Sequence, residues 1–257
     1  MPATDLPLLL EAATRAGDIA LRHFKADPQV WDKDDDQGPV TEADLAVNSM
    51  LTETLRAARP DYGWLSEESP DDPARLTTHR QFVVDPIDGT RAFINHSRDW
   101  AHALAVIEDR RVICGVVTLP ARGLTFAATL GGGATLNGQP LRVTQVTTLA
   151  EAHVLTTKPN LAPQHWQGGQ VPPFSKGFRS SLAYRLCLVA EAKFDAMLTL
   201  RPSWEWDIAA GALIVAEAGG TATDRRGRPL RFNNPHPQVD GVLAAGGVHG
   251  ALRAALT

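Results

Sequence analysis

Two aspartates stand three residues apart at the end of an apolar run. Residues 82–90 read Phe-Val-Val-Asp-Pro-Ile-Asp-Gly-Thr, so the run ends in Asp85 and Asp88 and continues into Gly89 and Thr90. Proline fixes its own φ and favours an extended conformation at the residue before it, which stiffens the turn. Glycine permits close backbone approach, and threonine can open a helix whose N–H groups face an anion. The segment can hold a hard cation beside a phosphate; the alternative is a solvated Asx turn.

Four further acids stand at the ends of expected elements. They are Asp44 at the head of one expected helix, Glu67 and Glu68 after a short apolar run, and Asp207 at the head of another helix. If these acids converge, their repulsion is costly unless metal ions neutralise them. Oxygen-only ligation points to magnesium, with manganese as the alternative, rather than zinc.

The acids occur in the order found in a known family. The matching stretches are residues 38–44, the Ser-Glu-Glu-Ser of 66–69, 85–90 with Phe93, and 206–211 followed by 217–220. On these residues the chain resembles the magnesium-dependent, lithium-sensitive phosphomonoesterases of the inositol monophosphatase superfamily. The stretches span most of the chain, and four motifs in sequence are far more specific than one.

The resemblance implies a ligand set for two to three magnesium ions. Its members are Glu67, Asp85, the carbonyl of Ile87, Asp88 and Asp207, with Asp85 bridging two ions. Glu68 would lie near the ions without ligating them. Glu67 is also counted among the catalytic residues.

The resemblance also implies how the reaction proceeds. Asp44, near a third and weaker ion, and Thr90 would orient the attacking water, while the backbone N–H groups of Gly89 and Thr90 would hold the phosphate. No phosphoenzyme is expected, because no residue of the set is an activated nucleophile. We assign no direct chemistry to His96 or His102, the two histidines near the central motif.

The substrate is a small phosphate ester, and the motifs divide between two subgroups. Residues 88–94 and the Ser-Ser-Leu of 180–182 with 187–191 are similar to 3′(2′),5′-bisphosphate nucleotidases. Residues 206–220 are close to the inositol type. Inositol monophosphatases carry a sugar-binding glutamate seven residues before the Asp207 position, where this chain has Leu200, which argues against direct recognition of inositol.

A bisphosphate substrate carries a second phosphate that requires cations, and arginine forks match phosphate geometry. Lys158, Lys176, Arg179 and Arg201 stand in loops of the second half; the alternative for each is solvated surface charge. We also expect Arg91 and Ser181 to contact the substrate. Lys33 matches a loop lysine of the family only loosely. The candidates for substrate contact are therefore Arg91, Lys158, Lys176, Arg179, Ser181 and Arg201.

Three functions remain open on the sequence. The leading hypothesis is a phosphatase that removes the 3′-phosphate of adenosine 3′,5′-bisphosphate. The second is a monoesterase of inositol, sugar or histidinol phosphate. The third is an inactive metal-binding regulatory protein, which the complete set of expected ligands argues against.

The elements that must position these residues follow from hydrophobic periodicity. Helical spacing predicts helices over about 7–25 and from Thr41 onward, and Asp44 stands in a capping-box relation to Thr41. Asp44 can therefore act as a helix cap, as a catalytic group, or as both. Apolar runs at 103–107, 112–119 and 124–129 predict a β-meander, in which the triple glycine 131–133 is a tight turn rather than a phosphate loop.

The second half alternates helix and strand. We predict strands at 154–157 and 197–200, and helices at 182–194 and 208–218. The chain thus divides into an α+β subdomain, 1–149, with most of the ligands, and an α/β subdomain, 150–257, with Asp207 and the substrate loops. The resemblance implies a layered αβαβα sandwich with the metal site between the halves.

Composition sets the remaining limits. A chain of 257 residues with a formal charge of −4 implies no basic face for a nucleic acid polymer. Cys114 and Cys187 stand in apolar runs, so buried free thiols are expected. We find no run long enough for membrane insertion and no signal-peptide pattern, which together predict a cytoplasmic protein. Monomer and homodimer both remain open.

Overall fold

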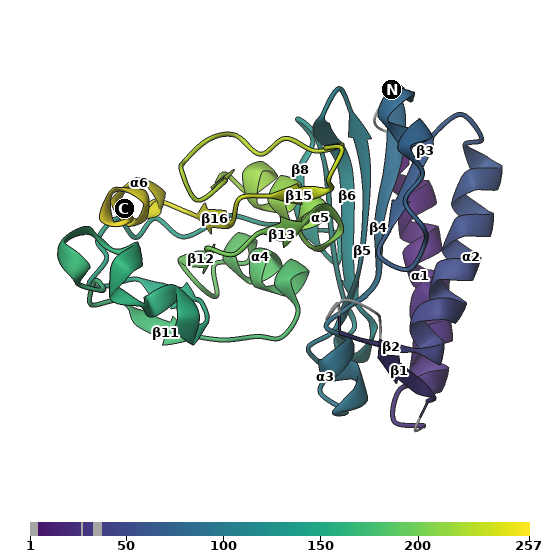
Figure 1. Cartoon of the computed structure of the whole chain (residues 1–257), viewed down its shortest axis with the longest axis horizontal. Coiled ribbons are helices and arrows are strands. Elements are labelled where there is room, and N and C mark those ends of the chain that lie inside the picture. The colour runs from purple at the N-terminus through teal and green to yellow at the C-terminus, as the bar shows by residue number, and fades with distance from the viewer. Residues whose placement is uncertain (1–4, 27, 33–37) are drawn as a thin grey trace.

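The structure is a computed structural model that describes residues 5–26, 28–32 and 38–257. Figure 1 shows five successive layers: helices α1 (Asp5–His23) and α2 (Glu42–Ala58), a large sheet, helices α4 (Leu182–Ala190) and α5 (Glu205–Glu217), a second sheet, and α6 (His249–Ala255). The layered αβαβα fold predicted above is therefore confirmed.

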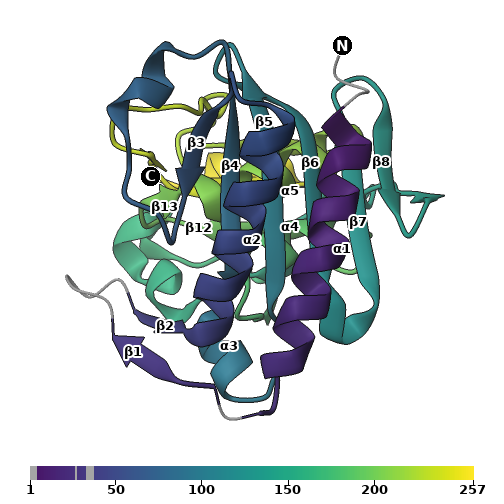
Figure 2. The ribbon, with the colours of Figure 1, turned by 90° about the vertical axis from the view of Figure 1, so that its right-hand side faces the viewer.

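The first sheet has seven strands among the described residues. Their order is β3-β4-β5-β6-β7-β8-β9, which Figure 2 shows behind α1 and α2. Only β3 and β4 are parallel; the other pairs are antiparallel. The strands are β3 (Gly63–Ser66), β4 (Arg80–Asp88), β5 (Ala101–Glu108), β6 (Arg111–Leu119), β7 (Leu124–Thr129), β8 (Gly133–Leu136) and β9 (Gln139–Pro140). The predicted meander is confirmed, and the triple glycine forms the tight turn between β7 and β8.

Helices α1 and α2 cover the outer face of this sheet. One stripe of each helix is buried, including Leu9 and Ala16 in α1 and Val47 and Leu51 in α2. Thr41 begins α2 with the predicted capping box, in which its side chain accepts from the Asp44 N–H and the Asp44 carboxylate accepts from the Thr41 N–H. The cap holds Asp44 at the sheet edge where the other acids gather.

Helices α4 and α5 form the middle layer and are apolar on nearly all sides. A helix that is hydrophobic all round must be buried on all sides, and here both sheets supply the cover. Close approach depends on small residues: a Cβ added at Gly115 of β6 would lie 2.9 Å from Cα of Ala210 in α5. Asp207 lies in the first turn of α5.

The second sheet is mixed. Within the described residues its order is β11-β10-β12-β16-β14, with β10 parallel to both of its neighbours and β16 antiparallel to β12 and β14. The strands are β10 (His153–Leu155), β11 (Ser175–Gly177), β12 (Ala196–Thr199), β14 (Thr221–Thr223) and β16 (Val242–Ala245). Its far face packs against α6 and Trp166. The division into subdomains 1–149 and 150–257 stays a prediction.

Shorter elements complete the chain. They are β1 (Val30–Asp32) paired with β2 (Pro39–Thr41), β13 (Ser203–Trp204) paired with β15 (Gln238–Val239), helix α3 (Thr90–Ile94), and 3₁₀ turns η2 (Pro73–Thr77), η3 (Pro120–Arg122), η4 (Lys158–Leu161), η5 (Pro163–His165) and η6 (Gln167–Gly169).

The predicted helix over 182–194 is too long. Helix α4 ends at Ala190 because Ala192 adopts a left-handed conformation, with φ of 59°. Both cysteines are buried free thiols, as predicted. No described helix combines the length and the hydrophobicity that crossing a bilayer requires.

Candidate active site

A bulge in β4 brings Asp85 and Asp88 to the same side of the sheet. Residues three apart in a regular strand point to opposite faces. Here Asp85 pairs with Ala103 and Asp88 with Ala101, so β4 holds one more residue than β5 between these pairs. The extra residue, within Pro86-Ile87, reverses the alternation and aims both carboxylates at the middle layer.

Three carboxylates from three elements converge. Oxygen atoms of Glu67, Asp85 and Asp207 all lie within 4.8 Å of one another. Glu67 follows β3, Asp85 stands in β4, and Asp207 reaches across from α5. Residues 140 positions apart in the chain thus meet in one cluster that could hold a metal ion.

Asp85 has the environment of a cation ligand. It is 1% exposed, and neither of its carboxylate oxygens accepts a hydrogen bond from the part of the chain that the structure describes. Burial, and then the charges of Glu67 and Asp88, raise the pKa of Asp85 well above its ordinary value. Burial, with Asp88 and Glu67, does the same to the pKa of Asp207. A buried carboxylate without donors, as Asp85 is among the described residues, fits a hard cation that takes oxygen ligands.

Asp88 is held differently from Asp85. One of its oxygens accepts hydrogen bonds from the Ser181 hydroxyl and from the Ala183 N–H, each at 2.6 Å. Burial raises the pKa of Asp88 to about 6, although these bonds oppose the shift. Ser181 also caps α4 by accepting from the Tyr184 N–H. The structure therefore places Ser181, expected to contact substrate, behind Asp88 and fully buried.

Asp44 and Thr90 meet as the resemblance implied. The Thr90 hydroxyl lies 3.3 Å from one oxygen of Asp44 and 3.1 Å from the carbonyl oxygen of Ile87. The other Asp44 oxygen accepts from the N–H and the hydroxyl of Thr41. The same carboxylate thus caps α2 and contacts Thr90; the cap is confirmed, and the catalytic role of Asp44 stays a prediction.

The turn that carries Gly89 is tightly constrained. Gly89 has φ of 96°, and an added Cβ would lie 3.0 Å from the carbonyl oxygen of Asp99. Nδ1 of the His102 ring contacts the carbonyl oxygen of Pro86 in this turn. Burial lowers the pKa of His102 to about 4, so its imidazole is neutral. His102 supports the turn, and the structure shows no chemical role for it.

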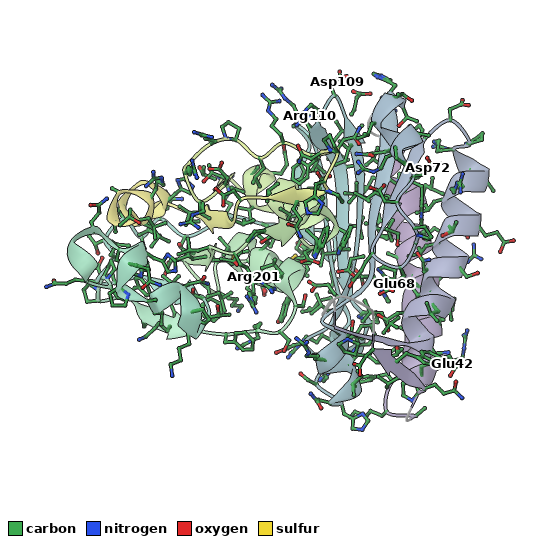
Figure 3. All side chains as sticks on the ribbon, viewed as in Figure 1. Glu42, Glu68, Asp72, Asp109, Arg110 and Arg201 are labelled. Carbon is green, nitrogen blue, oxygen red and sulfur yellow. The ribbon has the colours of Figure 1, made fainter. Side chains whose placement is uncertain are left out.

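A cavity of about 470 Å³ adjoins the acid cluster. Glu67, Asp88 and Thr90 line one side. Three arginines also line it: Arg91, Arg185 and Arg201. Figure 3 labels Arg201 in the C-terminal half of the chain, and it labels Glu68, the neighbour of Glu67, in the N-terminal half. We call this cavity the cleft. Its remaining lining residues are Gly38, Pro39, Gly89, Thr157, Pro159, Phe178, Ser180 and Thr199.

The other predicted cations lie elsewhere. Arg179 is not among the residues that line the cleft; it pairs with Asp99 at 3.7 Å. Lys158 and Lys176 line an adjoining cavity that shares Pro159 with the cleft. Lys33 lies outside the described residues. Arg91 and Arg201 are thus the predicted cations that the fold brings to the cleft.

The sequence analysis did not predict two residues of the cleft, Arg185 and Phe178. Arg185 is the one charged residue of α4, whose sequence is Leu-Ala-Tyr-Arg-Leu-Cys-Leu-Val-Ala. A lone charge in an otherwise apolar, fully buried helix was the signal that could have identified it. Phe178 stands just before the Ser-Ser-Leu motif but carries no such signal, because single aromatics are common in loops.

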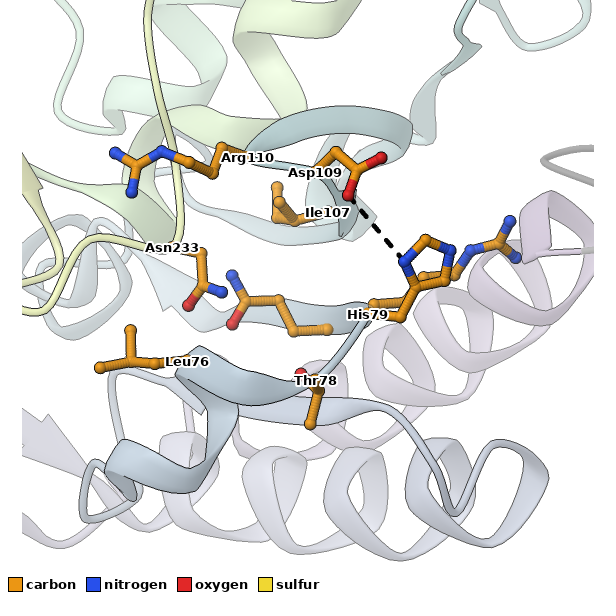
Figure 4. Close-up of a pocket in the computed structure, with 9 residues that line it drawn as sticks. Leu76, Thr78, His79, Ile107, Asp109, Arg110 and Asn233 are labelled. Atoms are coloured by element: carbon orange, nitrogen blue, oxygen red, sulfur yellow. Dashed lines mark ion pairs between the residues drawn. The ribbon is translucent and has the colours of Figure 1, made fainter.

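A second cavity, of about 160 Å³, lies at the opposite end of β4 (Figure 4). His79 and Asp109 border it and pair at 3.9 Å. The buried Gln81 amide also lines it and has no hydrogen-bond partner in the described part of the chain. Such a polar pocket suits ordered water.

The layered sandwich and the acid cluster between its sheets define a phosphomonoesterase. Residues 3–257 match the inositol monophosphatase family, and the chain belongs to that family. The catalytic class predicted from the sequence, a phosphoric monoester hydrolase, is confirmed.

Curated relatives carry more than one activity in their names. The chain is 34% identical to the 3′-phosphoadenosine 5′-phosphate phosphatase of Mycobacterium leprae, over 92% of this chain and 87% of that one. It is 33% identical to the histidinol-phosphatase of Chlorobaculum parvum, with 87% of each chain covered. It is 32% identical to the 3′(2′),5′-bisphosphate nucleotidase CysQ of Aggregatibacter actinomycetemcomitans, over 88% and 86%.

Solved structures agree on the fold. The suhB protein of Bartonella henselae superposes with a TM-score of 0.83 at 25% identity, covering 98% of this chain and 97% of that one. An inositol monophosphatase (IMPase) of Thermotoga maritima superposes with a TM-score of 0.81 at 26% identity, over 98% and 95%.

Proposed function

We propose that the protein is a magnesium-dependent 3′(2′),5′-bisphosphate nucleotidase that converts adenosine 3′,5′-bisphosphate to AMP and phosphate. One observation carries the proposal: the cleft sets an acid cluster against three arginines. An ester phosphate can sit beside the acids through bound cations while a second phosphate meets the guanidinium groups. Relatives named for this activity support the choice.

We propose Glu67, Asp85, the Ile87 carbonyl, Asp88 and Asp207 as the ligands of two to three magnesium ions, with manganese as a substitute. When bound, the ions would neutralise phosphate charge and make water more acidic. The oxygens of buried Asp85, which accept no hydrogen bond from the described part of the chain, support this assignment. The N–H groups of Gly89 and Thr90 would hold phosphate oxygens.

The protein's own proton acceptor is the Asp44–Thr90 pair. The Thr90 hydroxyl would accept a proton from the attacking water while donating its own to Asp44, 3.3 Å away. The water oxygen would bond to phosphorus as the bond to the sugar oxygen breaks, and that oxygen would take a proton from solvent. No covalent intermediate with the protein is required.

Inositol phosphate fits the cleft less well. Leu200, at the position of the family's sugar-binding glutamate, is 5% exposed and packs in the core of the second sheet. It offers no acceptor for ring hydroxyls. Histidinol phosphate remains the second candidate because a histidinol-phosphatase is among the relatives. The two buried thiols suit a reducing cytoplasm, where we expect the protein to act.

Initial rates of phosphate release with magnesium test the proposal. Adenosine 3′,5′-bisphosphate, inositol 1-phosphate, fructose 1,6-bisphosphate and histidinol phosphate are compared at equal ionic strength. We expect kcat/KM for the nucleotide to exceed the others by about 100-fold, which corresponds to about 2.7 kcal/mol. A preference for inositol or histidinol phosphate would overturn the substrate assignment and leave the phosphatase assignment intact.

A further inference from the structure

Phe178 presents an aromatic ring to the cleft. It follows β11 and precedes α4, lines the cleft, and is 53% exposed, more than any other large hydrophobic residue in the described chain. Leaving an aromatic ring partly in water forgoes part of the stabilisation that its burial would give. An exposed ring inside an active-site cleft, rather than on a convex surface, indicates a contact that forms when a ligand binds.

Arg185 fixes the orientation of this ring. Its guanidinium carbon lies 4.7 Å from the Phe178 ring centroid. Arg185 is only 8% exposed, and its Nε donates to the carbonyl oxygen of Arg179, and Nη2 to that of Ser180 at 3.4 Å. One face of the ring therefore contacts an anchored cation, while about half of the side chain stays exposed to solvent.

Within the described chain, the hydrogen bonds of the Arg185 guanidinium go to backbone carbonyl oxygens and not to a carboxylate. No carboxylate of the described residues lies within ion-pair distance of it. Burial lowers the pKa of Arg185, and the charge of Arg201 lowers it further, while Asp88 and Asp207 oppose the shift. Two arginines that repel each other across a cleft favour an anion bound between them.

We propose that Phe178 is the specificity-determining residue on which the heterocyclic base of the substrate stacks, and that Arg185 and Arg201 hold its non-reacting anionic group. The inference rests on the proposed nucleotidase function and names the residues that recognise the nucleotide. Base stacking on an aromatic side chain is worth about 1–3 kcal/mol, or about 5- to 150-fold in affinity. Polyol phosphates have no flat ring and cannot use this surface.

The test compares Phe178→Leu, which keeps apolar volume but removes the ring, with Phe178→Trp, which keeps a ring. Two substrates are used: adenosine 3′,5′-bisphosphate and its analogue without a base, 1-deoxyribose 3,5-bisphosphate. The measured quantity is the ratio of their kcat/KM values. We expect the ratio to fall about tenfold in Phe178→Leu and to be retained in Phe178→Trp.

A matched control is Leu130→Ala. Leu130 is 51% exposed in the β7–β8 turn, outside the cleft, so its loss should leave the ratio unchanged. Calorimetric titration with AMP gives a readout independent of turnover. The dissociation constant should rise about tenfold in Phe178→Leu and stay unchanged in Leu130→Ala.

Arg185 is tested through the second phosphate. Arg185→Gln should lower the preference for adenosine 3′,5′-bisphosphate over adenosine 3′-monophosphate by about tenfold, and Arg185→Lys should restore part of it. An unchanged preference in Arg185→Gln would overturn its role as the anion site.

The outcomes separate this inference from the proposed function. If the wild type hydrolyses both bisphosphates equally well, or if Phe178→Leu binds AMP as the wild type does, the stacking role is wrong although the nucleotidase stands. If the wild type prefers inositol or histidinol phosphate to both bisphosphates, the proposed function itself fails, and the inference fails with it.

Discussion

The acids at and beside the cleft differ in the hydrogen bonds that their carboxylate oxygens accept. Asp44 is a helix cap whose oxygens accept from Thr41 and Thr90, and Asp88 accepts from the backbone at the start of α4. Asp85 has no hydrogen-bond donor among the described residues. The fold thus stabilises the charged form of Asp44 and Asp88 by hydrogen bonds, and leaves that of Asp85 to a cation.

Thr90 should matter through its hydroxyl rather than its volume. Thr90→Val keeps the shape but removes the donor to Asp44, so we expect kcat to fall by about 100-fold with little change in KM. Thr90→Ser keeps the hydroxyl and should stay within about tenfold of the wild type. Steady-state kinetics decide between them, and equal losses in both variants would contradict a role for the hydroxyl.

Asp88→Asn should abolish activity without unfolding the protein. The amide oxygen can still accept from Ser181 and Ala183, so the local structure persists. One ligand charge is lost, and we expect turnover to fall by at least about 100-fold. Thermal unfolding and kinetics are measured together, with exposed Asp61→Asn as the control. Near-normal turnover would remove Asp88 from the ligand set.

At the scale of elements, a buried hydrogen-bond network connects the start of α5 to the segment that follows β3. Glu205, fully buried at the start of α5, accepts from the N–H groups of Asn233 and Asn234 and from the Asn234 side chain. Buried Arg75 donates to the Asn233 side chain at 2.7 Å and to the Asn234 carbonyl oxygen at 2.9 Å. This network ties the segment after Glu67 to the helix that carries Asp207.

Glu205→Gln should destabilise the fold. Its amide nitrogen would face a buried N–H donor, so at least one hydrogen bond is lost, and we expect about 2 kcal/mol less free energy of unfolding in urea. Glu217→Gln is a matched control at the other end of α5, where the carboxylate accepts from the exposed Gly131 and Gly133 N–H groups. Its cost should stay below about 1 kcal/mol; equal costs would contradict the importance of burial.

At the scale of the whole molecule, the cluster lies where the first sheet meets the middle layer of helices. Glu67 and Asp85 come from the first sheet and Asp207 from α5, and their three carboxylates lie within 4.8 Å of one another. A bound cation would relieve their repulsion and join parts of the fold that are distant in the chain.

Magnesium should stabilise the protein more at high pH than at low pH. The folded pKa of Asp88 is raised from 3.8 to about 6, so the metal-free protein loses stability as pH rises through that interval. Magnesium at 100 times its Kd should add about 2.7 kcal/mol near pH 7.5, and less near pH 5, where protons compete. Melting curves with magnesium or matched sodium chloride test this; equal shifts at both pH values would contradict it.

Much of the site could be predicted from local chemistry. Short stretches of chain contain several features of the site: the spacing of Asp85 and Asp88, the capping relation of Thr41 and Asp44, and the acids at the ends of elements. Turn stiffness, helix capping and hydrophobic periodicity act over a few residues, so they can be predicted from the sequence before the tertiary structure is known. The layered class followed from the order of these stretches and their resemblance to a family.

Other features depended on the tertiary structure because they depend on which residues become neighbours. Helix α4 ends early through the left-handed Ala192, and Arg179 is drawn away from the cleft by Asp99. Arg185 and Phe178 meet in the cleft, where the Arg185 guanidinium lies 4.7 Å from the centre of the Phe178 ring. Short stretches of chain are enough to predict the chemistry of the acids and the elements that carry them, because capping and periodicity act locally. That Arg185 and Arg201 face the same cleft as the acids follows from the packing of the fold, which sets which side chains become neighbours.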